Sequence, residues 1–329
     1  MTGVEQKIVQ QDEAEMRLDR WFKIHYSGLA FGALQKLLRS GQIRVDGKRA
    51  KSDNRLKVGQ IVRIPPLNID IKNNPSLTKN LLKQYDDNSA LQKMLLYEDK
   101  NMYILNKPAG LSVQGGSGVT RHIDGMLESW RNKKGEKPRL VHRIDKDTSG
   151  LLIVAKSRLA AQTLTDAFKK REVKKTYWAI VRDIPAKRTG RISNWLCKKS
   201  GSQGDYMTVC EHGDPDAQHA ITCYKVIDHI PKSISWMELE PLTGRTHQLR
   251  IHTANMGNPI IGDPKYFHAD SNWICPGGIQ NKLHLHARKL FFANIFGKKL
   301  EIIAPLPAHM QQTFNLFGFD ENIDEDKNI

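Results

Sequence analysis

The stretch Val141-His142-Arg143-Ile144-Asp145-Lys146-Asp147-Thr148-Ser149-Gly150-Leu151-Leu152-Ile153-Val154-Ala155 joins a charged loop to five apolar residues. An apolar run of this length predicts a buried strand, and Gly150 stands at the junction, where a tight backbone turn is needed. Polar groups at the mouth of a rigid strand are well placed for chemistry, because the packing behind them fixes their geometry. Asp145 lies between Arg143 and Lys146, so we expect its carboxylate to stay ionised. An ordinary solvated turn of mixed charge is the alternative.

The net charge of the chain indicates a polyanionic partner. The 329 residues include 51 Lys and Arg against 35 Asp and Glu, which gives a formal charge of +16. A soluble protein this basic usually binds nucleic acid. A membrane surface is less favoured, because no apolar run approaches twenty residues. The N-terminus has no apolar segment of the signal-peptide type, so we expect a cytoplasmic protein.

The cysteines and a histidine pair predict no metal site. Four cysteines lie far apart without a Cys-x-x-Cys spacing, at Cys197, Cys210, Cys223 and Cys275. This pattern indicates reduced thiols in a cytosol-like compartment rather than a zinc knuckle or a disulfide framework. His284 and His286 share a strand face, but no third ligand is evident.

The N-terminal part predicts a small α+β module over residues 15–64, after a polar and loose tail at residues 1–14. Apolar residues at helical spacing predict two short helices, the second closed by Gly41. A hairpin with Asp46-Gly47 at its turn follows, and a last strand ends before Pro65-Pro66.

A second and larger domain is expected at residues 91–319. Residues 65–90 are rich in proline and polar residues, which suits a linker. Within the larger domain the patterns predict a hairpin over 94–105, a helix over 157–170, a strand over 174–181 and a helix opening in 241–252. Residues 320–329 form an acidic tail that we expect to be disordered.

Several motifs carry a resemblance to the RluA-type RNA pseudouridine synthases. His-Arg-Ile-Asp-Lys-Asp-Thr-Ser-Gly at 142–150 resembles their catalytic motif, and Asn-Lys-Pro-Ala-Gly at 106–110 resembles a second signature. Lys-Thr-Tyr at 175–177 and Gly-Arg-Thr-His-Gln-Leu-Arg-Ile-His at 244–252 resemble two more. The Gly-Gly-Ser-Gly run at 115–118 and the domain order are most like the C subfamily, although Gln114 stands where that subfamily often has His. The resemblance covers residues 15–64 and 94–310.

The resemblance implies a fold and an activity. The fold is α/β of the α+β type, with a long mixed, largely antiparallel sheet and a central cleft, plus a small α+β module. The activity is conversion of uridine to pseudouridine, which requires no cofactor and no metal. Within the family the implied substrate is large-subunit ribosomal RNA, with no membrane and no obligatory protein partner.

The resemblance also assigns site residues. Asp145 is the catalytic carboxylate, acting as a nucleophile on C1′ or on C6 of the ring, or as a base at C1′. Arg250 is its guanidinium partner, whose fork matches carboxylate geometry. Tyr177 stacks on the target base, and Arg143 fills the stack after the base is flipped or holds a phosphate. Alternatives remain: Tyr177 as plain core, Arg250 as a surface residue, and Arg143 paired with Asp147.

Residues 15–64 resemble the S4 RNA-binding domain, through Arg-Leu-Asp at 17–19, Leu-Leu-Arg-Ser-Gly at 37–41 and Val-Asp-Gly-Lys at 45–48. The resemblance makes six cations candidate phosphate contacts: Arg17, Lys36, Arg39, Arg44, Lys48 and Arg49. A solvated surface cation is the alternative for each. A non-catalytic RNA-binding assembly factor that uses this module is the alternative for the whole chain.

Overall fold

The chain divides into two units, Met1–Tyr85 and Asp86–Ile329, and each is described by itself. The computed structural model describes residues 4–26, 29, 31–67, 75–116, 118–132, 134–201, 204–267 and 273–322, with all side chains except those of residues 12, 75–84 and 204. None of the helices in these ranges combines the length and apolar character needed to cross a bilayer.

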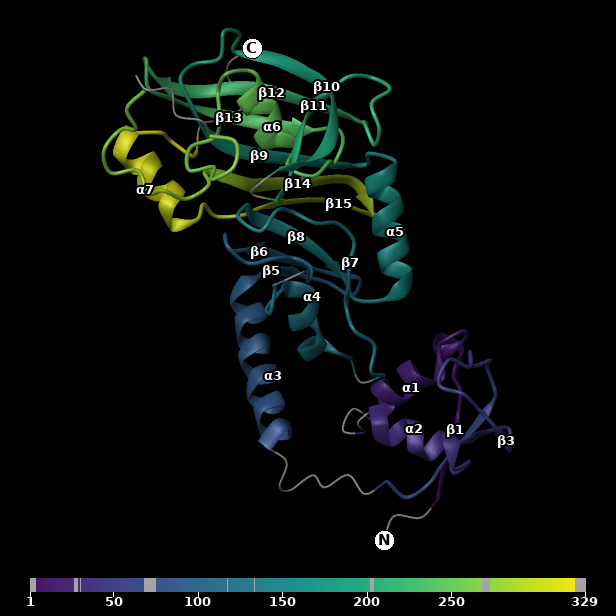
Figure 1. The fold of residues 1–329 in the computed structure, drawn as a ribbon. Helices are drawn as coiled ribbons and strands as arrows, with labels where there is room; N and C mark the ends of the chain where they lie inside the picture. Colours follow the sequence, from purple (N-terminus) through teal and green to yellow (C-terminus); the bar gives the residue numbers. More distant parts are fainter. Residues whose placement is uncertain are drawn as a thin grey trace. The chain divides into compact units, whose positions relative to one another are not determined.

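Unit 1 packs two helices against a four-stranded sheet (Figure 1). Its elements are β1 (Glu5–Ile8), η1 (Gln11–Glu13), α1 (Leu18–His25), α2 (Phe31–Arg39), β2 (Arg44–Val45), β3 (Lys48–Arg49) and β4 (Ile61–Ile64). The strand order is β1-β4-β2-β3. Trp21, Phe22 and Leu34 from the helices meet Ile43 and Val62 in the core. The expected helix pair and hairpin are confirmed, with Asp46-Gly47 at the turn in left-handed conformations.

The expectation of a loose tail at residues 1–14 is wrong for the described part. β1 pairs antiparallel with β4, from Glu5 opposite Ile64 to Ile8 opposite Ile61. Val9 is buried, and Glu13 accepts a hydrogen bond from the backbone of Gln10. Strand pairing along the backbone therefore orders a segment whose polar side chains suggested solvation.

The expectation of a linker at residues 65–90 is also wrong in its second half, because α3 (Pro75–Met94) is a helix. Proline is well tolerated in the first turn, where its missing N–H has no helical partner to lose. Asp87 forms an ion pair with Arg121 at 3.0 Å, and Asn88 accepts a 2.9 Å hydrogen bond from Trp130. Residues 68–74 of the expected linker, and the acidic tail beyond Asn322, lie outside the described residues.

Unit 2 is built on one eleven-stranded sheet (Figure 1). The strands are β5 (Leu95–Glu98), β6 (Met102–Lys107), β7 (Arg139–Leu140), β8 (Ser149–Ala155), β9 (Val173–Arg182), β10 (Thr189–Gly201), β11 (Gly204–Cys210), β12 (Gln218–Ile230), β13 (Ile234–Pro241), β14 (Leu285–Ile295) and β15 (Lys298–Ile303). Their order is β11-β10-β12-β13-β9-β14-β8-β6-β5, with β15 on β14 and β7 on β8. The β14–β8 pair is parallel and the other described pairs are antiparallel, so the expected mixed, largely antiparallel sheet is confirmed.

Helices cover both faces of this sheet, which explains the unbroken apolar run of β8. Every residue of β8 is buried. Leu151 and Ile153 face a core that includes α5 (Arg158–Lys169), whereas Leu152 and Val154 face a core shared with α3, α4 (Ile123–Met126) and η2 (Leu127–Trp130). Alternate residues of a strand point to opposite faces, so a strand covered on both sides must be apolar throughout. α7 (Ala308–Phe317) covers the sheet farther along, against β9 and β13.

Gly150 satisfies a steric requirement at the start of β8. Its φ is +106°, and a Cβ at this position would lie 2.3 Å from the carbonyl oxygen of Ala287 in the neighbouring β14. No side chain fits at that distance, which confirms the tight junction expected from the sequence.

Candidate active site

A cleft of about 600 Å³ opens on unit 2, and three segments far apart in sequence line it. These are the loop 141–148 before β8, the segment 165–177 from the end of α5 to the start of β9, and the loop 241–247 with the first turn of α6 (Gln248–Asn255). Leu285 of β14 also lines the cleft. The volume lies within the usual range for ligand pockets. The cleft therefore brings together Asp145, Arg143, Tyr177 and Arg250, all of which the sequence placed in one site.

The backbone beside Asp145 is held by a buried lysine. Lys107 is completely buried, and its Nζ donates to the carbonyl oxygens of Pro108, Leu111 and Lys146 at 2.8, 2.9 and 2.8 Å. Burial lowers the pKa of Lys107 to about 7, although Asp147 and Asp145 oppose the shift. The amide of Gly110 donates to the same carbonyl of Lys146 at 2.9 Å. The Asn-Lys-Pro-Ala-Gly signature thus fixes the loop that carries Asp145, a role that its sequence does not predict.

The guanidinium fork of Arg250 binds Asp263 rather than Asp145. Its Nε and Nη2 each donate to a carboxylate oxygen of Asp263 at 2.7 Å, whereas Nη1 lies 3.8 Å from Oδ2 of Asp145. The expected pairing of Arg250 with Asp145 is therefore present as an ion pair, but the fork itself is occupied by the buried carboxylate of Asp263. Burial opposes the charge of Arg250, but the hydrogen bonds and the charge of Asp263 outweigh it and raise its pKa.

Asp263 is the main residue that sequence reasoning missed. It is 3% exposed, and its Oδ1 also accepts hydrogen bonds from the backbone amides of Lys265 and Tyr266 at 2.8 and 3.1 Å. The preceding Gly262 has a φ of +70°, and a Cβ there would lie 2.0 Å from the carbonyl oxygen of Lys282. A Gly-Asp-Pro sequence indicates a turn, but nothing local in it indicates a partner thirteen residues earlier.

Tyr177 lies on the face of β9 that lines the cleft. Its neighbours Trp178 and Ile180 belong to the core under α7, and Ala179 belongs to the opposite core. Tyr177 packs against that opposite core while also lining the cleft. Burial and the negative charge of Asp145 raise its pKa, so its hydroxyl keeps its proton at neutral pH. The plain-core alternative does not account for its place in the cleft wall.

Gln248 ties the loop 241–247 to the sheet. Its carbonyl oxygen accepts from the Thr243 hydroxyl at 2.7 Å and the Arg245 amide at 3.0 Å, and its amide nitrogen donates to the carbonyl of Ile221 at 2.9 Å. α6 begins only here, because His247 has a left-handed φ of +54°. The helix expected within 241–252 is confirmed with this later start.

The histidines of the motifs act through ring hydrogen bonds. Nε2 of His142 accepts from the amide of Ile153 at 2.8 Å, and burial with the nearby Lys175 lowers its pKa to about 3. His247 bonds the Tyr266 hydroxyl at 2.7 Å, and His252 bonds the Thr222 hydroxyl at 2.9 Å. A neutral His142 therefore anchors the loop 141–148 to the strand that follows.

The walls of the cleft are strongly basic. Six of the described residues that line it are cations, namely Arg143, Lys169, Arg171, Lys175, Arg245 and Arg250, and Asp145 is the carboxylate among them. Arg143 is solvent-exposed in the wall of the cleft. Such a surface attracts a polyanion.

The six cations expected to contact phosphate lie in unit 1, and each of them is exposed. Arg17 forms an ion pair with Asp19 at 2.6 Å, and Arg44 donates to the carbonyl oxygens of Gly41 and Gly47 at 3.1 and 3.2 Å. Nε of Arg39 donates to the carbonyl of Gln35 at 3.3 Å.

Comparison with known proteins identifies the family. A family model described as RNA pseudouridylate synthase matches residues 101–255. The ribosomal large subunit pseudouridine synthase C of Rickettsia felis is 36% identical over 300 residues, which cover 91% of this chain and 95% of that protein. The protein of the same name from Vibrio cholerae is 33% identical, over 92% of this chain and 94% of its own.

A plant relative and a human structure extend this likeness. The mitochondrial RNA pseudouridine synthase 4 of Arabidopsis thaliana is 33% identical, over 93% of this chain and 80% of its own. The structure of human RNA Pseudouridylate Synthase Domain Containing 4 aligns with a TM-score of 0.58 and 28% identity, over 72% of this chain and 97% of that one. The chain therefore belongs to the RNA pseudouridylate synthase family, whose members isomerise uridine to pseudouridine in RNA.

Proposed function

We propose that this protein isomerises specific uridines of large-subunit ribosomal RNA, with Asp145 as the catalytic carboxylate. The substrate class follows the names of the bacterial relatives, which align with nearly the whole chain. The observation that carries the role of Asp145 is its position as the one carboxylate among the described residues that line a cleft with six cations, beside Tyr177 and Arg250. The reaction breaks the N1–C1′ bond, joins C5 to C1′, and exchanges the C5 proton for a proton on N1.

The surroundings of Asp145 support this role. Its side chain is 19% exposed, so it is accessible from the cleft, and Lys107 holds the backbone next to it. A carboxylate in this position serves each of the three routes: attack on C1′, attack on C6, or removal of a proton from C1′. Tyr177 is expected to stack on the base, and its protonated hydroxyl adds no second negative charge to the site.

A tritium release assay tests the role of Asp145. A large-subunit ribosomal RNA transcript labelled with tritium at C5 of uridine loses the label to water when C5 bonds to C1′. We expect Asp145→Asn to abolish release, whichever of the three routes operates. Asp147→Asn, in the same loop, is the matched control and should release tritium at close to the wild-type rate. Normal release by a folded Asp145→Asn protein would overturn the assignment.

We further propose that the target uridine is flipped into the cleft and that Arg143 fills the vacated stack or holds a phosphate. A uridine stacked inside RNA cannot reach a carboxylate in a cleft unless it is extruded. Arg143 is exposed and lines the cleft two residues before Asp145. We expect Arg143→Ala to slow release from a structured transcript far more than from a short unstructured oligonucleotide that contains the same uridine. Equal slowing on both substrates would contradict this role.

We also propose that unit 1 is an S4-like module that binds RNA through its exposed cations. Reversing Lys36, Arg39 and Lys48 together to Glu should weaken RNA binding and flatten its dependence on salt, because fewer counterions are released. Filter binding at several salt concentrations measures both effects. Reversing Arg20, Lys23 and Lys57, which lie outside the quoted motifs, controls for net charge alone. Equal losses in both triple variants would mean that charge, and not this surface, matters.

A non-catalytic assembly factor is the weaker alternative for this chain. Its membership of a synthase family and the presence of Asp145, Tyr177 and Arg250 around one cleft favour the enzyme. The release assay separates the two functions, because an assembly factor binds the transcript and releases no tritium.

A further inference from the structure

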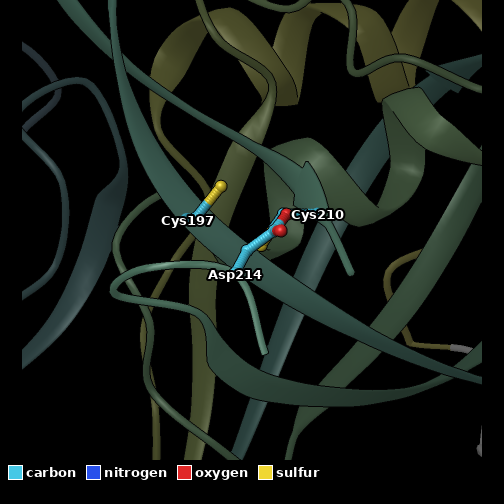
Figure 2. Close-up of side chains that lie close together, drawn as sticks. All are labelled: Cys197, Cys210 and Asp214. Carbon is cyan, nitrogen blue, oxygen red and sulfur yellow. The ribbon is translucent and has the colours of Figure 1, made fainter. Parts of the chain in front are cut away.

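Two cysteines that are distant in sequence lie together on one face of the sheet of unit 2. Trp195 of β10 pairs with Cys210 of β11, and Cys197 pairs with Thr208. Residues directly opposite point to the same face, so Cys197 and Cys210 are diagonal neighbours on that face. Asp214 approaches them from the turn after β11. One potential ligand atom from each of these three residues lies within 4.8 Å of the other two (Figure 2).

We propose that Cys197, Cys210 and Asp214 bind one zinc ion, which has a structural role separate from the active site. Zinc is favoured because thiolates are soft ligands, and two thiolates with one carboxylate suit a small tetrahedral ion. Asp214 is exposed, so water would supply the fourth ligand. Spacing along the sequence gives no hint of this site, because the hairpin register creates it.

The geometry requires only a small closure around the ion. Ligand atoms on one tetrahedral zinc, with bonds of about 2.0–2.3 Å, lie about 3.5–3.8 Å from one another. The present separations of up to 4.8 Å must therefore shrink by roughly 1 Å. The residue best able to move is Asp214, which is exposed on a turn, where one of its carboxylate oxygens accepts a 3.0 Å hydrogen bond from the amide of Glu211.

A disulfide between the same cysteines fits less well. Diagonal neighbours of an antiparallel pair have Cα atoms about 7–8 Å apart, whereas a disulfide needs about 4.4–6.8 Å. A metal bridge spans a longer distance between the two sulfurs and tolerates the diagonal placement.

The position of the site explains what a metal there would do. The opposite face of the same strands carries Leu196 and Val209, which pack against Ile251 of α6. α6 also carries Arg250. β11 is an edge strand of the sheet. A metal that joins it to β10 and to the following turn would hold in place the two strands on which α6 packs, and α6 forms one wall of the cleft.

The experiment uses the full-length protein, stripped with a chelator and titrated with Co²⁺ as a spectroscopic substitute for zinc. We expect one equivalent to produce a thiolate-to-cobalt charge-transfer band in the near ultraviolet, and one equivalent of Zn²⁺ to bleach it. Cys197→Ser and Cys210→Ser should lose the band and bind Zn²⁺ at least ten-fold more weakly. Asp214→Asn should keep the band with reduced affinity. Cys275→Ser, at an exposed cysteine outside the cluster, is the matched control and should match the wild type.

Three results would overturn the proposal. These are a wild-type protein without a thiolate band, a band that persists in Cys210→Ser, and a reducible Cys197–Cys210 disulfide as the form of the chelator-treated protein. If a serine variant fails to fold, alkylation of the wild type replaces it. One equivalent of Zn²⁺ should then slow modification of Cys210, located by peptide mass mapping, and leave that of Cys275 unchanged. Equal modification of Cys210 with and without Zn²⁺ would count against the site.

Discussion

The substitution Asp263→Asn tests how the site holds Arg250. Arg250 and Asp263 are 4% and 3% exposed, and two hydrogen bonds of 2.7 Å join them. Removing the charge of one partner of a buried ion pair costs about 3–5 kcal/mol, because the other charge is left uncompensated. Asn retains one oxygen that can still accept one of the two bonds, so we expect the lower end, about 3 kcal/mol.

The same substitution should reduce activity beyond its effect on stability. Without the Asp263 carboxylate, the nearest acid to the guanidinium is Asp145, now 3.8 Å from Nη1. We expect the fork to turn towards Asp145 and to draw its carboxylate away from the substrate. A displacement of about 1 Å in a catalytic group can cost about 100-fold in rate, and we expect a loss of this order in single-turnover tritium release.

Two measurements separate these effects. Urea unfolding followed by tryptophan fluorescence gives the loss of stability, and release measured well below the unfolding transition gives the loss of rate. Asp166→Asn is the matched control, because Asp166 forms an exposed ion pair with Lys169 at 3.8 Å and such pairs contribute about 0–1 kcal/mol. A loss of stability in Asp263→Asn no larger than in this control would refute the reasoning.

Three further predictions follow from buried groups. Gly150→Ala should destabilise unit 2 by about 3 kcal/mol or more, because its Cβ would lie 2.3 Å from the Ala287 carbonyl oxygen. Gly277→Ala is the control and should leave stability unchanged, because there is open space around Gly277. Equal urea midpoints for the two variants would disprove this steric account. Lys107→Met should cost about 3 kcal/mol and slow tritium release, since three carbonyl acceptors lose the ammonium group as a donor. A stable and fully active variant would contradict the anchoring role. Four histidines keep lowered pKa values in the folded state, of about 3 or 4, so they take up protons on unfolding. Their contribution to the free energy of unfolding should therefore be complete above about pH 6.5. It should fall as the pH drops towards 4, by about 1.4 kcal/mol per pH unit for each histidine. Urea midpoints that stay constant from pH 6.5 to 5 would contradict this prediction. These residues are His142, His252, His284 and His286.

The parts of the site that the sequence could predict are those written in contiguous motifs. Asp145, Tyr177 and Arg250 each stand in a recognisable pattern, and the apolar run after Gly150 predicts its strand directly. Asp263 could not be predicted, because its partner comes from another element and its own surroundings indicate only a turn. The proximity of Cys197 to Cys210 likewise depends on a hairpin register that no local spacing encodes.

The errors in the fold have similar physical causes. β1 is a four-residue strand at the edge of a sheet, with polar side chains, so its pairing comes from the backbone and leaves little trace in the pattern. α3 contains Asp87 and Asn88, which favour turns, and both are satisfied by Arg121 and Trp130 from elsewhere in unit 2. In both cases tertiary contacts override local preference.

The position of β14 has a consequence for how the enzyme is made. β14 is the strand through which the two parts of the large sheet are joined: β9 and its neighbours, which carry Tyr177, lie on one side, and β8, which follows Asp145, lies on the other. The parallel register sets His286 beside Ser149, 137 residues earlier in the chain. During synthesis, both walls of the cleft emerge from the ribosome before the strand that unites them. We expect a chain truncated at residue 284 to release no tritium, and release by such a fragment would contradict this order of assembly. An incomplete nascent chain would thus be unable to modify RNA, and catalysis would begin only when translation is nearly finished.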